Sequence, residues 1–335
     1  MKLIKSIIKK NLKAYKQYTN QTKRYLHYKY QFIRKLWTTF GIRSELGKIT
    51  NKSLYIIAIP GCVHILHICL YYIPEHTRVI VIANGLLDEE ISWISEEPKV
   101  NRLIKLPHKM VHSDVLDILF LSVRETFAII DYDCFVLNQK IWDELFVFDP
   151  LCQGNAYFYI YNESLNLKIP FTFFLSFNAP IFRSLMQKYN IDSSQIVYKN
   201  LHFKVRKKLM DIKIDQDNMP ETKKQYFDTI KVLQMLGIAD GYPIRFQEYT
   251  KNEIIHVGGV SYWNGNINQW TARGAYFWHR ALEIQPNVNL QVFYTNLFGS
   301  KTSQEILDTN PLLMTILGSD ALHQYDEIIK KTYLA

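Results

Sequence analysis

The stretch FAIIDYDCFVL, residues 127–137, contains an apolar run, an acidic pair and a second apolar run. The first run has the composition of a buried β-strand. Asp131 and Asp133 follow it, and residues i and i+2 of an extended chain point to the same side. Carboxylates this close repel each other, and a divalent cation relieves the repulsion. The stretch therefore predicts a metal site at a strand end, and the alternative is an ordinary turn or cap, where Asp is common.

Two earlier apolar runs, residues 54–59 and 78–83, also read as buried strands, and each ends at a turn signal. Helical patterns lie between and after them, over residues 63–72, 88–95 and 113–124. This alternation predicts an α/β fold with a mostly parallel sheet and helices on both faces. Ligands of such sheets bind beyond the carboxyl ends of the strands, where Pro60-Gly61, Asn84-Gly85 and the acidic pair would lie.

The second half of the chain shows a less regular pattern. Its expected elements are strands over 157–161, 171–177 and 254–257, helices over 178–189 and 220–236, and two helical stretches after residue 303 with a break near Pro311.

The segment IHVGGVSYW, residues 255–263, holds a second candidate for the site. A neutral imidazole at His256 can complete a metal site. Gly258 and Gly259 allow the backbone to approach a phosphate closely. A half-buried histidine before a glycine turn is the alternative, and the acidic pair upstream favours a metal ligand.

A third candidate is Asp217, in the segment IDQDN, residues 214–218. A carboxylate here could orient an acceptor hydroxyl or act on it as a base. Asp217 also precedes an expected helix, so an N-terminal cap is an equally good interpretation.

Charge divides the chain unevenly. Residues 1–50 hold thirteen Lys and Arg and one acidic residue, which gives +12, so the other 285 residues together carry −3 of the net +9. Apolar and aromatic residues recur at helical spacing among these cations. We expect a basic amphipathic helical arm over residues 1–48, a catalytic domain over 49–300 and a C-terminal helical segment over 301–335. The arm could lie on an anionic membrane, pack on its own domain or join an oligomer.

Composition argues against several classes of protein. No apolar run reaches the roughly 18 residues of a membrane-spanning helix, and the first residues lack the pattern of a signal peptide. The four cysteines show no paired metal spacing, which favours a reducing, cytoplasmic setting, with the arm on the inner face of the membrane. The slightly acidic remainder of the chain argues against nucleic acid as a partner.

These motifs together resemble those of GT-A (Rossmann-like) glycosyltransferases, and their order is most similar to the glycogenin and bacterial galactosyltransferase type. In that family a first strand ends near the nucleotide base, as Ala58-Ile-Pro-Gly61 does here in position. A D-x-D follows a hydrophobic strand, and a D-Q-D segment and a histidine before a Gly and a Trp come later. The resemblance covers roughly residues 53–280.

The resemblance implies a nucleotide-sugar donor, with UDP as the expected nucleotide, and a Mn²⁺ or Mg²⁺ ion held by Asp131, Asp133 and His256. It also places Ala58, Pro60, Gly61 and Asn84 along the nucleotide pocket. Two features depart from the family. Its diphosphate-binding lysine is absent near Trp263, and His112 and Asp114 stand where the family has a basic residue on the helix before D-x-D.

The expected activity is therefore metal-dependent, hexosyltransferase-like sugar transfer to a glycan or lipid-linked acceptor, with retention of the anomeric configuration as the family branch implies. Two alternatives stay open. One is a nucleotidyltransferase on a similar fold, although Pro60-Gly-Cys-Val-His64 lacks the basic glycine-rich loop of that class. The other is a non-enzymatic protein that binds a membrane or a partner through its basic arm.

Overall fold

The computed structural model describes residues 39–220, 226–250, 252–260 and 271–334. Most of the predicted basic arm lies outside the described residues, and the predicted domain boundaries stay predictions. The first described helix is α2, Phe40–Leu46. It lies within the range over which the sequence predicts the helical arm. The apolar Leu46 is fully buried, and the Glu45 carboxylate lies 2.7 Å from Nη2 of Arg102, so this segment is fixed to the fold.

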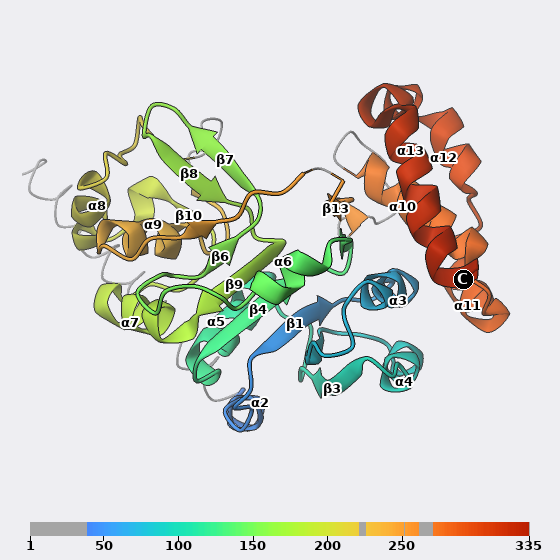
Figure 1. The fold of residues 1–335 in the computed structure, drawn as a ribbon, viewed down its shortest axis with the longest axis horizontal. Coiled ribbons are helices and arrows are strands. Elements are labelled where there is room, and N and C mark those ends of the chain that lie inside the picture. Colours follow the sequence, from blue (N-terminus) through green and yellow to red (C-terminus); the bar gives the residue numbers. More distant parts are fainter. Residues whose placement is uncertain (1–38, 221–225, 251, 261–270, 335) are drawn as a thin grey trace, which may run out of the picture.

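A seven-stranded sheet forms the centre of the molecule, in the order β12-β6-β9-β4-β1-β2-β3 (Figure 1). The strands are β1 Ser53–Ala58, β2 Val79–Ala83, β3 Val100–Lys105, β4 Thr126–Ile130, β6 Asn155–Ala156, β9 Phe174–Asn178 and β12 Arg245–Phe246. Parallel pairing joins β4, β1, β2 and β3, while β9 runs antiparallel to both of its neighbours, β4 and β6. The predicted α/β class with a mostly parallel sheet is confirmed.

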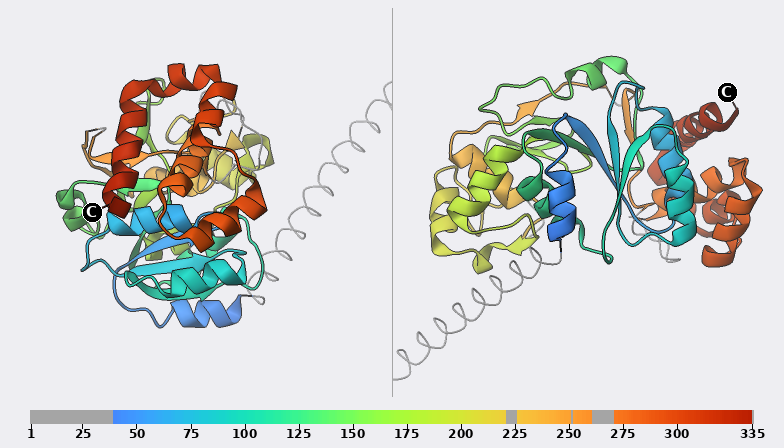
Figure 2. Two further views of the ribbon diagram at one scale, coloured as in Figure 1. Left: turned by 90° about the vertical axis from the view of Figure 1, so that its right-hand side faces the viewer. Right: turned by 90° about the horizontal axis from the view of Figure 1, so that it is seen from below.

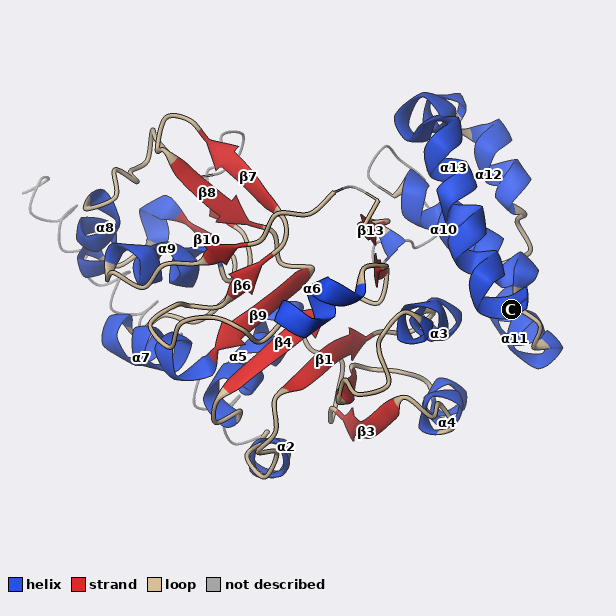
Figure 3. Ribbon diagram, in the orientation of Figure 1, coloured by secondary structure: helices blue, strands red, loops and turns tan. Residues whose placement is uncertain are grey.

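Helices cover both faces of this sheet (Figure 3). They include α3 Val63–Tyr71, α4 Asp88–Ser95, α5 His112–Ser122, α6 Gln139–Glu144, α7 Ala179–Tyr189, α8 Phe203–Met210 and α9 Lys231–Ala239. Strand β1 shows why two layers form. Leu54 and Ile56 belong to one hydrophobic core, and Tyr55 between them belongs to the other. Alternate residues of a strand face opposite sides, so an apolar run buries both.

Two parts of the sequence interpretation need correction. Strand β3 was not expected, because Asn101, Arg102 and Lys105 interrupt its apolar pattern; as an edge strand it is only partly buried. The helix expected over residues 220–236 begins only at Lys231, since Tyr226–Phe227 forms the short strand β11, paired with β10, Ile196–Val197.

A small hairpin, β7 Tyr159–Asn162 and β8 Leu167–Pro170, extends from the sheet. At the other side of the molecule, four helices form a layer of their own: α10 Ala272–Ile284, α11 Val288–Phe298, α12 Ser303–Thr309 and α13 Pro311–Leu334 (Figure 2). The predicted break near Pro311 is confirmed.

The C-terminal helices pack directly on α3. The Tyr333 ring of α13 stacks on the His67 ring with centroids 5.4 Å apart, and the Tyr333 hydroxyl donates to the His64 carbonyl at 2.8 Å. Among the described residues, none of the helices combines the length and hydropathy needed to cross a bilayer.

Candidate functional site

The acidic pair lies where β4 reaches the carboxyl edge of the sheet. The Asp131 amide donates to the carbonyl of Phe173 at 2.8 Å, and the Asp131 carbonyl accepts from the Cys134 amide at 2.9 Å. The first bond ties the end of β4 to the start of β9, and the second closes a tight turn. Asp133 is 3% exposed despite its charge. This local geometry keeps both carboxylates at one strand end, as the sequence predicts.

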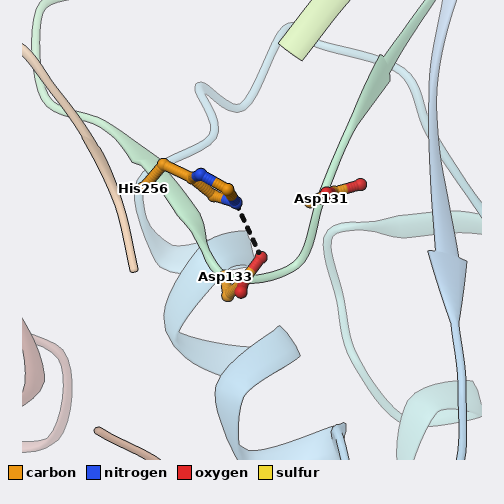
Figure 4. A group of neighbouring side chains, drawn as sticks. All are labelled: Asp131, Asp133 and His256. Carbon is orange, nitrogen blue, oxygen red and sulfur yellow. Dashed lines mark ion pairs between the residues drawn. The ribbon is translucent and has the colours of Figure 1, made fainter. Parts of the chain in front are cut away.

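His256 reaches the acidic pair through a two-stranded sheet. Strand β13, Ile254–His256, pairs antiparallel with β5, Cys134–Val136, so that His256 lies opposite Cys134. The Val257 amide also donates to the Asp133 carbonyl at 3.1 Å. Figure 4 shows the result, with Nε2 of His256 3.5 Å from Oδ1 of Asp133. One ligand atom from each of Asp131, Asp133 and His256 lies within 4.8 Å of the others.

The imidazole of His256 is held by an aromatic ring that the sequence interpretation missed. The ring of Phe173 stacks on it, with centroids 3.7 Å apart and an angle of 14° between the planes. The same residue accepts the amide of Asp131 through its carbonyl. Phe173 therefore contacts both halves of the candidate site, and an apolar residue in a strand pattern carries no signal of that role.

The electrostatics of the three side chains are those of a site with excess negative charge. Burial raises the pKa of Asp131 to about 7, with a further rise from the Asp133 carboxylate and a decrease from His256. Burial works to lower the pKa of His256, but the carboxylates of Asp133 and Asp131 raise it overall. A proton or a cation is thus favoured among these groups.

The donor set fits a divalent metal ion. Two carboxylates and an imidazole are ligands that Mn²⁺ accepts, and carboxylate oxygens suit Mg²⁺ as well. The identity of the metal stays a proposal.

The predicted nucleotide-pocket residues follow the ends of β1 and β2. Ala58 ends β1, and Pro60 and Gly61 form the turn before α3. The Gly61 amide donates to the Glu90 carboxylate at 2.6 Å, which uses a group that could otherwise meet a ligand. Asn84 exchanges two hydrogen bonds with the backbone of Met110, at 2.9 and 2.7 Å, and so fixes the loop before α5.

His112 and Asp114 begin α5, on the same edge of the sheet. Burial lowers the pKa of His112, and the charge of Asp228 opposes that shift. Gly258 and Gly259 follow β13 with φ angles of 71° and 78°. Only glycine adopts such angles without strain, so both positions depend on it.

The structure does not bring Asp217 into this group. It lies in the exposed loop after α8, where its amide donates to Oδ1 of Asp215 at 2.9 Å. Asn218 of the same loop accepts from the Ser164 hydroxyl, beside the β7–β8 hairpin. Figure 1 shows α8 at the left end of the fold, on the other side of the central sheet from β13. The catalytic role of Asp217 stays a prediction.

Comparisons with known proteins concern the part of the chain that carries the acidic pair. Residues 43–182 match the family model of the StrH glycosyltransferase N-terminal domain. No curated protein sequence matches the chain.

Three solved structures illustrate a distant likeness. An active-site mutant of LgtC is 11% identical, with 65% of this chain and 79% of that chain covered and a TM-score of 0.37. TarS residues 1–349 of S. aureus are 10% identical, with 83% and 90% covered and a TM-score of 0.37. GlyE of Streptococcus pneumoniae is 12% identical, with 60% and 46% covered and a TM-score of 0.36.

These structural overlaps are weak, and the assignment rests on the family model together with the motifs. The D-x-D pair lies inside the matched range, at the end of β4, and the third candidate ligand follows at residue 256. The resemblance to glycosyltransferases that the motifs indicate is therefore confirmed by the match of residues 43–182 to the StrH glycosyltransferase N-terminal domain.

Proposed function

We propose that this protein is a metal-dependent glycosyltransferase that transfers a sugar from a UDP-sugar to a glycan or glycolipid acceptor. The observation that carries the proposal is the pairing of β13 with β5, which places His256 beside Asp133 and Asp131. These residues come from segments more than 120 positions apart, at the edge of the sheet where ligands of such folds bind.

Each part of the site has a role in this reaction. A bound Mn²⁺ or Mg²⁺ would supply Lewis-acid stabilisation of the charge that develops on the leaving diphosphate. Asp131, Asp133 and His256 would hold the ion, and Phe173 fixes the plane of the imidazole. The loops at Ala58–Gly61 and at Gly258-Gly259 would receive the nucleotide and its phosphates. Because the diphosphate-binding lysine of the family is absent, other groups at this edge of the sheet would contact the phosphates.

Finer properties rest on the sequence. Similarity to the glycogenin type supports UDP as the nucleotide and retention at the anomeric carbon. The +12 charge of residues 1–50 supports a peripheral position on the anionic inner face of the membrane, where each Lys or Arg contributes about 1 kcal/mol.

Thermal stabilisation by nucleoside diphosphates tests the proposal. UDP, GDP, CDP and ADP are each added with and without Mn²⁺, and we expect the melting temperature to rise with UDP only when metal is present. Asp133→Ala should abolish the rise, while the exposed Asp308→Ala serves as a matched control. No stabilisation of the wild type by any diphosphate in Mn²⁺, or an intact rise in Asp133→Ala, contradicts the proposal.

The same assay with nucleoside triphosphates, together with an assay of the released product, tests the nucleotidyltransferase alternative. That enzyme class would be stabilised by a nucleoside triphosphate with metal and would release pyrophosphate. We expect neither from this protein, and we expect release of UDP from a UDP-sugar instead.

A further inference from the structure

The turn that follows β1 is held by a buried carboxylate on α4. Oε1 of Glu90 accepts from the Gly61 amide at 2.6 Å, and Oε2 accepts from the Leu87 amide at 3.0 Å. Glu90 is fully buried. Burial of an acidic side chain costs free energy unless the group is paired or hydrogen-bonded. The bonds from the Gly61 and Leu87 amides offset this cost for Glu90.

The third partner of that carboxylate comes from the C-terminal helices. The hydroxyl of Tyr294, on α11, donates to Oε1 of Glu90 at 2.7 Å and accepts from the Val63 amide at 3.1 Å. Tyr294 is fully buried as well. One hydroxyl therefore links the turn at Gly61, the start of α3 and the side chain that binds the turn.

Helix α10 holds the same turn from the other side. Nε1 of Trp278 donates to the Gly61 carbonyl at 2.7 Å, and Trp278 is 2% exposed. Both backbone polar groups of Gly61 are thus engaged, with its φ at 88°. The conformation of this turn depends on three side chains, Glu90, Trp278 and Tyr294.

The same helix also contacts the loop that follows His256. Gly274 lies so close to that loop that a Cβ atom on it would be 2.4 Å from the Val260 nitrogen and 2.5 Å from the Gly259 carbonyl carbon. Gly274 and Trp278 are four residues apart, and so lie on one face of α10. A single helix face therefore touches both the Gly61 turn and the Gly259–Val260 loop.

We propose that α10 and α11 position the two loops of the donor site, with Glu90, Tyr294 and Trp278 as positioning residues for the nucleotide loop and Gly274 for the metal loop. This inference rests on the proposed function. Helix α11, which lies beyond the range of roughly residues 53–280 that the family resemblance covers, thereby becomes part of the structure that binds the donor.

The physical reason is preorganisation. A binding loop fixed before the ligand arrives avoids the entropy cost of ordering it on binding. Supporting hydrogen bonds also keep a site within the small tolerance that binding and catalysis require. Hydrogen bonds to a buried charged group are the strongest candidates for this task.

Two binding affinities, measured on full-length variants, distinguish effects on the nucleotide loop from effects on the metal loop. The first is that of Mn²⁺ alone, and the second is that of UDP in saturating Mn²⁺, both by calorimetric titration. Tyr294→Phe removes one hydroxyl and keeps the ring, and we expect UDP affinity to fall on the order of tenfold with Mn²⁺ affinity unchanged. Glu90→Gln should act in the same direction.

Gly274→Ala, unlike Tyr294→Phe, should weaken the binding of Mn²⁺. Its Cβ displaces the Gly259–Val260 loop and with it the end of β13, so we expect Mn²⁺ affinity itself to fall. The matched control is Tyr55→Phe, on β1, because Tyr55 is equally buried and its hydroxyl has no hydrogen-bond partner among the described residues. This variant should change neither affinity.

The outcomes distinguish the inference from the proposed function. Wild-type binding of UDP with Mn²⁺, together with unchanged affinities in Tyr294→Phe and Gly274→Ala, overturns the inference and leaves the function standing. A wild type that binds neither Mn²⁺ nor UDP overturns the function, and the inference with it. If Glu90→Gln does not fold, as judged by its melting curve, the conservative Tyr294→Phe decides.

Discussion

The ring of Phe173 lies flat against the imidazole of His256, with 3.7 Å between the centroids. Phe173 comes from the segment just before β9 and His256 from β13, so this contact joins the central sheet to the small β5–β13 sheet. It limits the rotation of a side chain whose Nε2 faces Asp133.

Phe173→Leu is expected to weaken Mn²⁺ binding on the order of tenfold, since groups that orient a metal-bound histidine have effects of that size. The measurement is calorimetric titration with Mn²⁺. Phe171→Leu is the matched control, because the Phe171 ring stacks on Phe173 at 5.7 Å and is 38% exposed. Equal affinities for the two variants would argue against an orienting role.

Asp131→Asn is expected to stabilise the metal-free protein and to remove its stabilisation by Mn²⁺. The pKa of Asp131 rises from 3.8 to about 7 on burial beside Asp133, so the folded state holds this proton more tightly than the unfolded chain does. The stability that comes from this tighter proton binding is fully present below the pKa of Asp131 in the unfolded chain. It is lost as the pH rises through the pKa of Asp131 in the folded protein.

The gain in melting temperature should therefore be larger at pH 8 than at pH 5, on the order of 2 °C or more. Melting curves in a chelator at the two pH values provide the test. A variant that is less stable than the wild type at pH 8 without metal would contradict the proposed charge repulsion.

Asp240→Asn tests a charge cluster remote from the site. The Asp240 carboxylate accepts from Lys188 at 2.6 Å and from the Tyr189 hydroxyl at 2.8 Å, and Nζ of Lys208 lies 3.4 Å away. Burial works to raise the pKa of Asp240, but the bonds to Lys188 and Tyr189 lower it overall.

A carboxyl group whose pKa is lowered on folding stabilises the protein at pH values above its pKa in the unfolded chain. This stability is lost as the pH falls through its pKa in the folded protein. Asp240→Asn should thus destabilise the protein at pH 7 by about 1 kcal/mol. The difference should shrink as the pH falls below 3.8, the unfolded value, toward the lowered folded value. Urea unfolding at several pH values measures the difference, with Asp308→Asn, at an exposed position of α12, as control. A difference that persists at low pH would assign the effect to packing instead.

Removal of residues 1–38 is expected to weaken binding to anionic liposomes without loss of the fold. The cut keeps α2, because Leu46 is buried and Glu45 binds Arg102. Sedimentation with phosphatidylserine liposomes at two salt concentrations compares the shortened and full chains, and neutral liposomes serve as the control. Equal binding of both chains would exclude the arm as the membrane contact.

Local sequence patterns determined the buried strands of this protein and the edge of the sheet that carries the candidate site. The apolar runs of β1, β2 and β4 predict buried parallel strands, and the residues that end them predict the edge where the candidate site lies. Strand burial leaves a direct trace in sequence, because a strand covered on both faces must be apolar throughout. Strand β3 left no such trace, since an edge strand tolerates Asn101 and Arg102.

Only the tertiary structure decided which distant residues meet. The sequence offered His256 as a third ligand beside the acidic pair, and the pairing of β13 with β5 is what brings it there across more than 120 positions. The contact of Tyr294 with Glu90 spans 204 positions and depends on the packing of α11 against the sheet domain. Such contacts depend on the summed packing of many elements, whereas a strand or a turn depends mainly on its own few residues.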